Sequence, residues 1–323
     1  MSIVIFGACW LISQIQQLVT IGIPLYNEEK YIEDAIRSAA SQCATVWVSD
    51  NASTDESAEI CEKVSREYPN VHFVRQPHNV GAIANFKFLL DRADTPYFMW
   101  LGGHDALPDG YVKKLLILLE EFPEAVLAYG FSRQINLKGE TIHDYDYFFN
   151  SKLSDRLAKT RVLSLIRHLS YCSLIHGIFR TDALQAAWED TGTSAYLGAD
   201  HVLLTNASLR GPFLYSPETY LIRREAHPID TSDAQVKRMN PLESNRTQSP
   251  YREMQCRQYA QAEAVSKGDG LSGFFFRLRT RFYLIQRFGP FGETFTTHSI
   301  DWLLEMNSRW IGKCLKWLER KDI

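Results

Sequence analysis

Short apolar runs alternate with amphipathic stretches over the first 130 residues of the chain. Residues 18–23 (LVTIGI) and 45–49 (TVWVS) have the length and composition of buried strands. Between them, residues 28–42 carry apolar side chains at the i, i+3, i+4 and i+7 spacing of an amphipathic helix, starting at Ile32. The same alternation continues with strands at 71–74, 96–101 and 125–129 and helices at 80–92 and 109–121. It predicts an α/β fold: a largely parallel central sheet with helices on both faces.

The pattern changes after residue 130. The sequence NLKGE at 136–140 is typical of a hairpin turn. Later periodicity predicts helices at 153–169 and 198–211 and strands at 173–179, 212–216 and 219–224. A polar stretch begins near residue 236 and is followed by helical sequence. We therefore expect an N-terminal apolar extension (1–17), an α/β domain (18–235, with halves 18–130 and 131–235) and a C-terminal helical extension (236–323).

One helix start has a specific signal. Ser53 and Glu56 stand three residues apart just before an apolar-periodic stretch, which is the spacing of a capping box. In that motif each side chain accepts a hydrogen bond from the other residue's backbone N–H. The spacing predicts a helix that starts at Ser53.

Polar residues gather directly after three of the predicted strands. They are PLYNEE after the first strand, DNASTD after the second and GGHD after the fourth. In parallel sheets, ligands bind beyond the carboxyl ends of the strands, so these three loops are expected to meet at one edge. The convergence predicts a nucleotide-type site.

Composition and charge limit the function classes. The chain has 323 residues, of which 45% are hydrophobic and 23% charged, as in an ordinary folded protein. A net charge of −3 argues against nucleic acid as a partner. Six scattered cysteines without a CxxC pair favour reduced, mostly buried thiols in a cytoplasmic setting over a disulfide or zinc framework.

The N-terminus contains an apolar run, IVIFGACWLI at residues 3–12, that is too short to span a bilayer as a helix. No Lys or Arg precedes it and no cleavage site follows, so we expect no signal peptide. The run is a packed extra segment, a membrane-touching tail or a misassigned start. Elsewhere no stretch approaches 18 uninterrupted apolar residues, and we expect a cytoplasmic protein without a membrane span.

Several stretches in register resemble the nucleotide-binding half of family 2 glycosyltransferases, which have the GT-A fold. They include VTIGIPLYNEEKYIEDAIRSAASQ, VSDNASTDESAEI and NVGAIANF, whose order and spacing match over roughly residues 18–130. A weaker match continues to about residue 230 through GADHVLL and RREAHP. The last ninety residues add nothing to the resemblance.

The resemblance implies an inverting glycosyltransferase in polysaccharide or glycolipid synthesis. Such an enzyme takes a sugar from a nucleoside-diphosphate sugar, with a UDP-sugar favoured, and uses Mn²⁺ or Mg²⁺. The alternative is a non-catalytic sugar-nucleotide-binding or scaffold protein with a degenerate metal motif. A nucleotidyltransferase is a further rival, but it would ordinarily have a glycine-rich basic loop where this chain has PLYNEE.

The nucleotide-binding residues implied by the resemblance begin with Asp50, which in the family hydrogen-bonds the base. Asn51 stands where a second aspartate is frequent. Tyr26 is implied as a partner of the base or ribose, with Pro24 and Glu28 beside it. Local explanations also exist: a turn aspartate, a proline that ends a strand, and a glutamate at the favourable N-terminus of a helix.

The motif NVGAIAN supplies Asn79, Gly81 and Asn85 to the same expected site. Glycine lacks a Cβ, so the backbone at Gly81 can approach a nucleotide closely. A simple turn between a loop and a helix explains this glycine almost as well.

The stretch MWLGGHDALPD at 99–109 covers the position of the family's metal motif, normally D-x-D or D-D. The matching triplet is Gly103-His104-Asp105, so the first carboxylate is missing. Hard cations prefer oxygen ligands, which makes Asp105 the expected metal or diphosphate ligand, and imidazole suits Mn²⁺ better than Mg²⁺ at His104. Alternatively, Asp105 caps the following turn and His104 packs beside it.

The motif RREAHP carries a further candidate ligand. His227 stands where many GT-A enzymes place a metal-binding histidine, although a lone histidine before a proline is often structural. Arg223 and Arg224 either neutralise a diphosphate or form surface ion pairs.

Asp200 in GADHVLL matches the aspartate of the family's E-D motif, with Ala199 in place of the glutamate. The resemblance implies that Asp200 is the general base that takes the proton of the acceptor hydroxyl. The local alternative is an acid that caps a helix start. Gly103, His176 and Gly198 are expected to line the sugar or acceptor pocket.

The C-terminal sequence FFFRLRTRFYLIQRFGPF interleaves aromatic residues with arginines. A basic, aromatic, amphipathic segment at 271–290 suits the surface of an anionic membrane. The inner face of the cell membrane is therefore an expected peripheral location. Packing of its apolar face on the domain or on a second subunit, giving a homo-oligomer, is the alternative. A last helix with an apolar face is predicted over 300–318.

Overall fold

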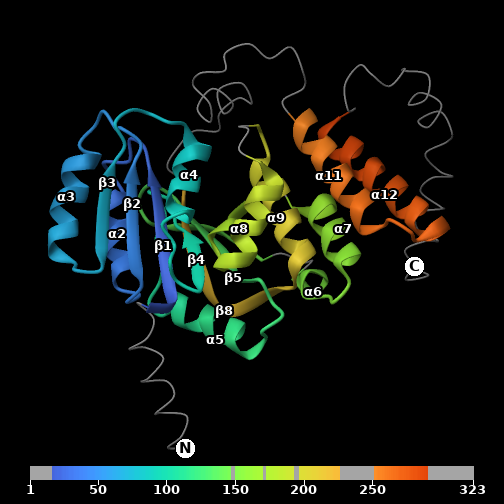
Figure 1. Ribbon diagram of the computed structural model, residues 1–323. Helices are drawn as coiled ribbons and strands as arrows, with labels where there is room; N and C mark the ends of the chain where they lie inside the picture. The colour runs from blue at the N-terminus through green and yellow to red at the C-terminus, as the bar shows by residue number, and fades with distance from the viewer. Residues whose placement is uncertain (1–16, 147–149, 170–171, 193–195, 226–250, 290–323) are drawn as a thin grey trace, which may run out of the picture.

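A computed structural model describes residues 17–146, 150–169, 172–192, 196–225 and 251–289 of the chain. Its centre is one eight-stranded sheet (Figure 1). Seven strands follow the order β3-β2-β1-β4-β7-β5-β6, and the eighth, β8, also pairs with β5. The strands are β1 (Val19–Leu25), β2 (Thr45–Asp50), β3 (Val71–Arg75), β4 (Tyr97–Trp100), β5 (Leu127–Ile135), β6 (Thr141–Tyr145), β7 (Ile178–Arg180) and β8 (Phe213–Arg224).

The first four strands are parallel to one another, as the sequence predicts. β1 lies between β2 and β4, and β3 pairs with the outer edge of β2. Because the strands share one direction, the ends of β1, β2 and β4 lie at the same edge of the sheet. The loops after these strands carry the polar motifs.

Helices cover both faces of this sheet, which confirms the predicted fold class. Along β4, Tyr97 and Met99 point into a core shared with α2, α3 and α5, while Phe98 and Trp100 point into a second core with α4, α7, α8 and α9. Alternation of side chains along a strand places them on opposite faces, so two separate cores form. The helices are α2 (Ile32–Ala40), α3 (Ser57–Glu67), α4 (Ala82–Leu90), α5 (Tyr111–Glu121), α6 (Asn150–Leu153), α7 (Ala158–His168), α8 (Thr181–Thr191), α9 (Ala199–Arg210), α11 (Arg252–Val265) and α12 (Gly270–Phe288).

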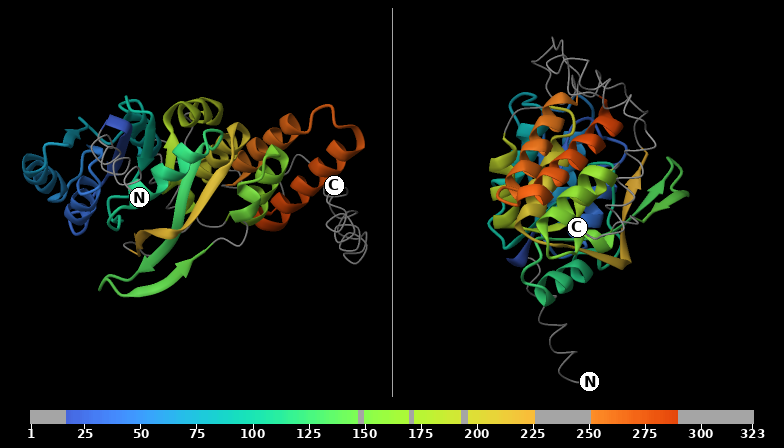
Figure 2. Two further views of the ribbon diagram at one scale, coloured as in Figure 1. Left: turned by 90° about the horizontal axis from the view of Figure 1, so that it is seen from below. Right: turned by 90° about the vertical axis from the view of Figure 1, so that its right-hand side faces the viewer.

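The predicted hairpin at 136–140 is confirmed, because it joins the antiparallel strands β5 and β6. The two strands predicted at 212–216 and 219–224 are one strand, β8. Opposite the consecutive residues Gly130 and Phe131, the register on β8 jumps from Ser216 to Tyr220, so the interruption is a bulge and not a strand end. Figure 2 shows β8 running beside β5 along most of its length.

The strand predicted at 173–179 is largely wrong. Residues Cys172–His176 form a 3₁₀ turn, η1, and β7 contains three residues. The N–H of Gly177 closes the turn on the carbonyl of Leu174, so the chain bends before it can pair. The helix α8, which directly follows β7, was not predicted.

The capping box predicted at Ser53 and Glu56 is also wrong. The helix α3 begins at Ser57, and the side chain of its N-cap residue, Glu56, makes no capping hydrogen bond. The N–H of Ser57 donates instead to Oδ1 of Asp55 at 3.1 Å. The Ser53 hydroxyl accepts a hydrogen bond from the backbone N–H of Asn27, on another loop. A long-range partner therefore replaces the local one.

The C-terminal helices α11 and α12 form an antiparallel pair that packs on α7 and α9 (Figures 1 and 2). Tyr283 and Leu284 of α12 share a small core with Val162 and Ile166 of α7. This pair is the predicted C-terminal helical extension. Within the described ranges, no helix is long and apolar enough to cross a membrane.

In the described part of the chain, Cys43, Cys61 and Cys256 are free thiols. Cys61 is buried, but Cys43 and Cys256 are exposed, so the expectation of mostly buried thiols is wrong for this set. The N-terminal run at 3–12, the predicted last helix at 300–318 and His227 lie outside the described residues.

Candidate functional site

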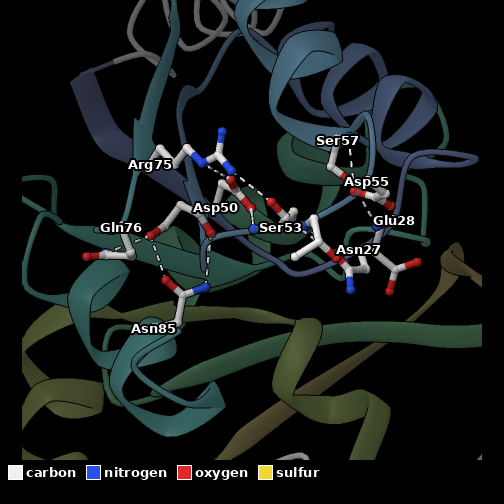
Figure 3. A network of polar contacts seen from close by, with 11 residues as sticks. Asn27, Glu28, Asp50, Ser53, Asp55, Ser57, Arg75, Gln76 and Asn85 are labelled. Carbon is white, nitrogen blue, oxygen red and sulfur yellow. Dashed lines mark hydrogen bonds and ion pairs between the residues drawn. The ribbon is translucent and has the colours of Figure 1, made fainter. Parts of the chain in front are cut away.

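Residues 26–31, after β1, and 51–57, from the end of β2 to the first residue of α3, are joined by hydrogen bonds; we call them the β1–β2 corner (Figure 3). The backbone N–H groups of Asn27 and Glu28 donate to the hydroxyls of Ser53 and Ser57, both at 2.9 Å. In return, the N–H of Thr54 donates to Oδ1 of Asn27 at 2.9 Å. Asn27 adopts a left-handed backbone with φ of 57°. Sequence reasoning missed these contacts between the two loops, although Asn and Ser in loops are the usual residue types for such bonds.

Asp50 lies at the end of β2, fully buried beneath this corner. Its Oδ1 accepts a hydrogen bond from the N–H of Ser53 at 3.0 Å. Its Oδ2 lies 3.3 Å from Nε of Arg75, within ion-pair distance but without the geometry of a hydrogen bond. The Asp50 carboxylate therefore shapes the loop and leaves one buried oxygen without a hydrogen bond (Figure 3).

Asn51 links the end of β2 to the loop that precedes α4. Its Nδ2 donates to Oδ1 of Asn79 at 2.9 Å, and its Oδ1 accepts from the N–H of Val80 at 2.8 Å. Gly81 then starts α4 with φ of 86°, a backbone that glycine adopts without strain. The three predicted residues Asn51, Asn79 and Gly81 are thus brought together.

Asn85 is buried and bonded inside the protein. Its Oδ1 accepts from the Ser49 hydroxyl at 2.6 Å, and its Nδ2 donates to the Ser49 carbonyl at 3.0 Å. Gln76 donates to the same hydroxyl from Nε2 at 3.1 Å (Figure 3). Asn85 therefore holds α4 against β2, with both polar atoms of its amide bonded to Ser49.

Pro24 and Tyr26 frame the end of β1. Pro24 pairs with Ser49 in the sheet register. Tyr26 follows directly after the strand and is 39% exposed, so its ring is accessible at the edge where the polar loops meet.

The loop after β4 brings Glu28, His104 and Asp105 together; we call residues 101–106, with His176 and Asp200, the β4 corner. Nδ1 of His104 lies 2.9 Å from Oε1 of Glu28, and Nε2 lies 3.9 Å from Oδ1 of Asp105. Asp105 is buried, and its Oδ1 accepts from the N–H of Arg224 at 3.0 Å. Two backbone hydrogen bonds between residues 106 and 222 fasten this loop to β8.

Two glycines, Gly102 and Gly103, leave room for the carboxylate side chains of Asp105 and Glu28 to pack against the loop after β4. A Cβ on Gly102 would lie 2.7 Å from Oδ2 of Asp105, and a Cβ on Gly103 would lie 3.3 Å from Cγ of Glu28. Side chains at these positions would push both carboxylates away. Gly103 thus contacts the side chain of Glu28 and does not line the cavity described below.

The histidines of the β4 corner have pKa values shifted in opposite directions. Burial lowers the pKa of His104, but the hydrogen bond to Glu28 and the charges of Asp105 and Glu28 outweigh it and raise that pKa above its usual value. Burial lowers the pKa of His176, and the charge of Asp105 opposes this only partly. Compared with a free imidazole, protonation of the ring is therefore favoured at His104 and disfavoured at His176.

A cavity of about 310 Å³ opens beside His176, between α4, α8 and α9. Nδ1 of His176 lies 3.0 Å from the carbonyl of Trp100 at the end of β4. Since a carbonyl only accepts, Nδ1 carries the proton and Nε2 is the acceptor. Asp200 and Arg223 also line the cavity, and apolar side chains form most of its remaining wall: Ala82, Ile83, Phe86, Ile175, Trp188, Ala199 and Leu203.

Asp200 lies in the first turn of α9, where its Oδ1 accepts from the N–H of His201 at 2.9 Å. Gly198 precedes the helix with φ of 84° and is not part of the cavity wall. A Cβ on Gly198 would lie 2.3 Å from Sδ of Met254 on α11, so Gly198 lets α11 pack against the start of α9. The structure thus gives Gly198 a role in packing, and its predicted place in the sugar or acceptor pocket stays a prediction.

The two arginines of β8 have different surroundings. Arg223 lines the cavity. The guanidinium of Arg224 lies 3.5 Å from Asp34 and over the ring of Tyr31. Of the two alternatives that the sequence left open, Arg224 therefore fits the surface ion pair. Arg223 fits the neutralisation of a diphosphate, because it lines the cavity.

Among the residues that the structure describes, no three His, Cys, Asp or Glu side chains gather as a metal-binding group. The β4 corner offers two donors, a carboxylate at Asp105 and an imidazole at His104. His227, the third predicted ligand, lies outside the described residues.

The model of the family described as "Glycosyl transferase family 2" matches residues 20–187, slightly more than half of the chain. The chain belongs to glycosyl transferase family 2. The match covers the elements from β1 to β7 and most of α8, and it therefore includes the β1–β2 corner and His176. The helix α9 with Asp200 lies beyond it.

Relatives of this family 2 chain include a "Teichoic acid poly(glycerol phosphate) polymerase" of Staphylococcus epidermidis, 26% identical over 180 residues. That alignment covers 52% of this chain and 23% of the polymerase. "Abequosyltransferase RfbV" of Salmonella typhimurium is 27% identical over 192 residues, which are 55% of this chain and 58% of the transferase. The chain thus spans less than two thirds of the length of either relative.

Among solved structures, S. aureus TarS 1–349 in complex with UDP-GlcNAc superposes with a TM-score of 0.56 at 16% identity. The superposition covers 84% of this chain and 72% of TarS 1–349. At this level of identity the similarity establishes the GT-A fold of this family 2 protein.

Proposed function

We propose that the protein is an inverting glycosyltransferase that moves a sugar from a nucleoside-diphosphate sugar to a hydroxyl group of a polysaccharide or glycolipid. Family membership supports glycosyl transfer, and the relatives include a teichoic acid polymerase and an abequosyltransferase. UDP-sugars are the favoured donors, because the TarS structure of the same fold is a UDP-GlcNAc complex.

The observation that carries the proposal is the cavity at the end of β4. A carboxylate (Asp200), a neutral imidazole (His176) and a guanidinium (Arg223) face it together, in an otherwise apolar wall. A base, an acceptor and a cation around one apolar space are the groups that displacement at an anomeric carbon needs.

In the proposed reaction, Asp200 takes the proton of the acceptor hydroxyl while the hydroxyl oxygen bonds to the anomeric carbon. The bond between that carbon and the diphosphate oxygen breaks, and its electron pair leaves with the nucleoside diphosphate. Attack from the face opposite the leaving group inverts the anomeric centre. Oδ1 of Asp200 already accepts from the N–H of His201, so we assign the proton to Oδ2.

We further propose that the β1–β2 corner holds the nucleoside. The accessible ring of Tyr26 suits stacking on the base or ribose, and the unbonded Oδ2 of Asp50 suits a base N–H. Contact with Oδ2 requires the Arg75 side chain to turn out of its ion pair with Asp50. Asn51, Asn79 and Gly81 then set the path of the loop beside the nucleotide.

A divalent cation fits the β4 corner as a partly protein-bound ion. Glu28 holds Nδ1 of His104, as carboxylates commonly do for metal-binding histidines, and this leaves Nε2 on the side of Asp105. With two described donors, and His227 proposed as a third, the remaining ligands would be diphosphate oxygens and water, as is usual for Mg²⁺. When bound, the ion supplies positive charge that stabilises the leaving diphosphate.

The test is release of nucleoside diphosphate from a panel of UDP-, GDP- and dTDP-sugars, in the presence of Mn²⁺ or Mg²⁺. We expect one donor class to be turned over and the rate to fall when the metal is chelated. A donor that binds in calorimetry but is never turned over, with any metal, would instead support a non-catalytic sugar-nucleotide-binding protein.

A further inference from the structure

The helix α12 presents an apolar stripe to solvent. Leu271, Phe274, Phe275 and Leu278 have the i, i+3, i+4, i+7 spacing of one helix face, and their exposed fractions are between 43% and 78%. They make up four of the ten large hydrophobic residues that are exposed in the described part of the chain. Single exposed apolar residues are ordinary, whereas a contiguous stripe indicates an interaction surface.

The stripe lies in a strongly basic part of the molecule. Residues 150–169, around α7, and 266–289, around α12, together contain ten Lys or Arg and two Asp, a local net charge of +8. Since the whole chain carries −3, the remaining residues carry −11. The positive charge is therefore concentrated on one pair of helices.

These two helices lie side by side at the end of the molecule opposite α3 (Figures 1 and 2). An ion pair of 2.5 Å between Lys159 and Asp269 joins the start of α7 to the start of α12. Leu157, 64% exposed, precedes α7 at the same end and adds to the apolar surface. The cavity with Asp200 lies between α4, α8 and α9, and none of the residues that line it belongs to α12.

We propose that α12 and the start of α7 form a surface that docks on an anionic lipid bilayer. Leucine and phenylalanine enter the boundary between headgroups and acyl chains, while Lys and Arg stay with the anionic headgroups. Nucleic acid is a poorer fit, because leucines gain little from phosphates or base edges. The excess of +8 also opposes a symmetric contact in which this surface of one copy faces the same surface of another.

The experiment is co-sedimentation of the full chain with vesicles of phosphatidylcholine alone, or with about 30% phosphatidylglycerol. We expect binding to the anionic vesicles, little binding to the neutral ones, and weaker binding as salt increases. The double variant Phe274→Ser/Phe275→Ser should reduce partitioning by about tenfold or more. Its matched control is Phe122→Ser, which removes a phenylalanine that is 44% exposed at the end of α5.

A charge variant separates the electrostatic part. Lys267→Glu/Arg156→Glu reverses two exposed charges of this surface and should weaken binding to anionic vesicles by about tenfold or more. Lys63→Glu, on the exposed face of α3, is the control and should bind as the wild type does. Unchanged melting temperatures show that each variant is folded.

Equal binding of all variants, or equal binding to neutral and anionic vesicles, would overturn the proposal. So would a dimer that the Phe274→Ser/Phe275→Ser variant converts to monomer in solution without any vesicle binding. Binding of single-stranded DNA, in place of vesicles, through the same residues would overturn it as well. None of these outcomes depends on turnover of a sugar donor.

Discussion

The β1–β2 corner and the β4 corner lie at the same edge of the sheet but use polar residues differently. In the β1–β2 corner, Asn27, Ser53 and Ser57 bond one another's loops, and beneath it Asn85 is bonded to Ser49. In the β4 corner, His176 and Asp200 reach a cavity, and two histidine pKa values are shifted in opposite directions. Polar groups whose hydrogen bonds are all made within the protein fix the conformation of the loops. Titratable groups beside a cavity, with atoms still free to bond a ligand, can take part in a reaction.

The largest effect is expected at Asp200. Asp200→Asn removes the proposed base and should lower transfer by about 10²–10⁴-fold while donor binding stays close to the wild-type value. The matched control is Asp182→Asn, because Asp182 is also in the first turn of a helix and its Oδ1 accepts from the next backbone N–H, yet it is exposed on α8. Rates and donor affinities are measured for both. Equal loss of binding and transfer in Asp200→Asn would make Asp200 structural.

Next in size is a loss of stability at Asn85. Asn85→Ala removes the acceptor of the Ser49 hydroxyl proton and the donor to the Ser49 carbonyl, leaving the hydroxyl with Gln76 alone, and should lower the free energy of unfolding by about 2–3 kcal/mol. The measurement is urea denaturation, and the activity of the folded fraction should remain near that of the wild type. A folded variant of full stability that fails to bind donor would move Asn85 from the scaffold into the nucleotide site.

A smaller effect is expected at Asp105. Asp105→Asn keeps the acceptor for the N–H of Arg224 but removes the charge, so metal-dependent turnover should fall by about tenfold or more. Titration of Mn²⁺ against turnover checks this, and Asp105→Ala should in addition lose stability because the Arg224 N–H is left unpaired. Unchanged metal dependence in Asp105→Asn would remove Asp105 from the proposed ligand set.

The smallest effect is the pH dependence of the two histidines in metal-free protein. The folded pKa of His104 is raised, so its contribution to stability is complete below its unfolded pKa of about 6.5 and is lost as pH rises through the folded pKa. The folded pKa of His176 is lowered, so its contribution is complete above about 6.5 and is lost as pH falls through the folded pKa. Proton titrations followed by NMR should show His104 above and His176 below the ordinary value.

Two variants check the sign of these shifts. His104→Gln should cost more stability at about pH 5.5 than at about pH 8.5, and His176→Gln should cost less at the lower pH. Glu28→Gln should lower the pKa of His104 and leave that of His176 in place, because Glu28 bonds His104. The same direction of change at both histidines would contradict the different environments of the two rings.

Much of the fold was predictable because buried parallel strands and amphipathic helices leave periodic signals over a few residues. The alternation from residue 18 to 130 predicted β1 to β4 and helices α2, α4 and α5 with small errors at the ends. The signals failed where structure depends on distant partners. β8 remains one strand across Pro217 because it pairs along the full length of β5, and residues 172–176 form a turn although their sequence is apolar enough for a strand.

The candidate site shows the same division. The sequence by itself determined which residue types stand after β4, where His104 and Asp105 lie, and at the start of α9, where Asp200 lies. The tertiary structure alone decided that Glu28 meets His104 across 76 positions, that Ser53 bonds Asn27 and that Met254 packs on Gly198. The reason is physical: backbone periodicity is set by near neighbours, whereas side-chain partners, burial and pKa shifts depend on which distant segments the packed core brings into contact.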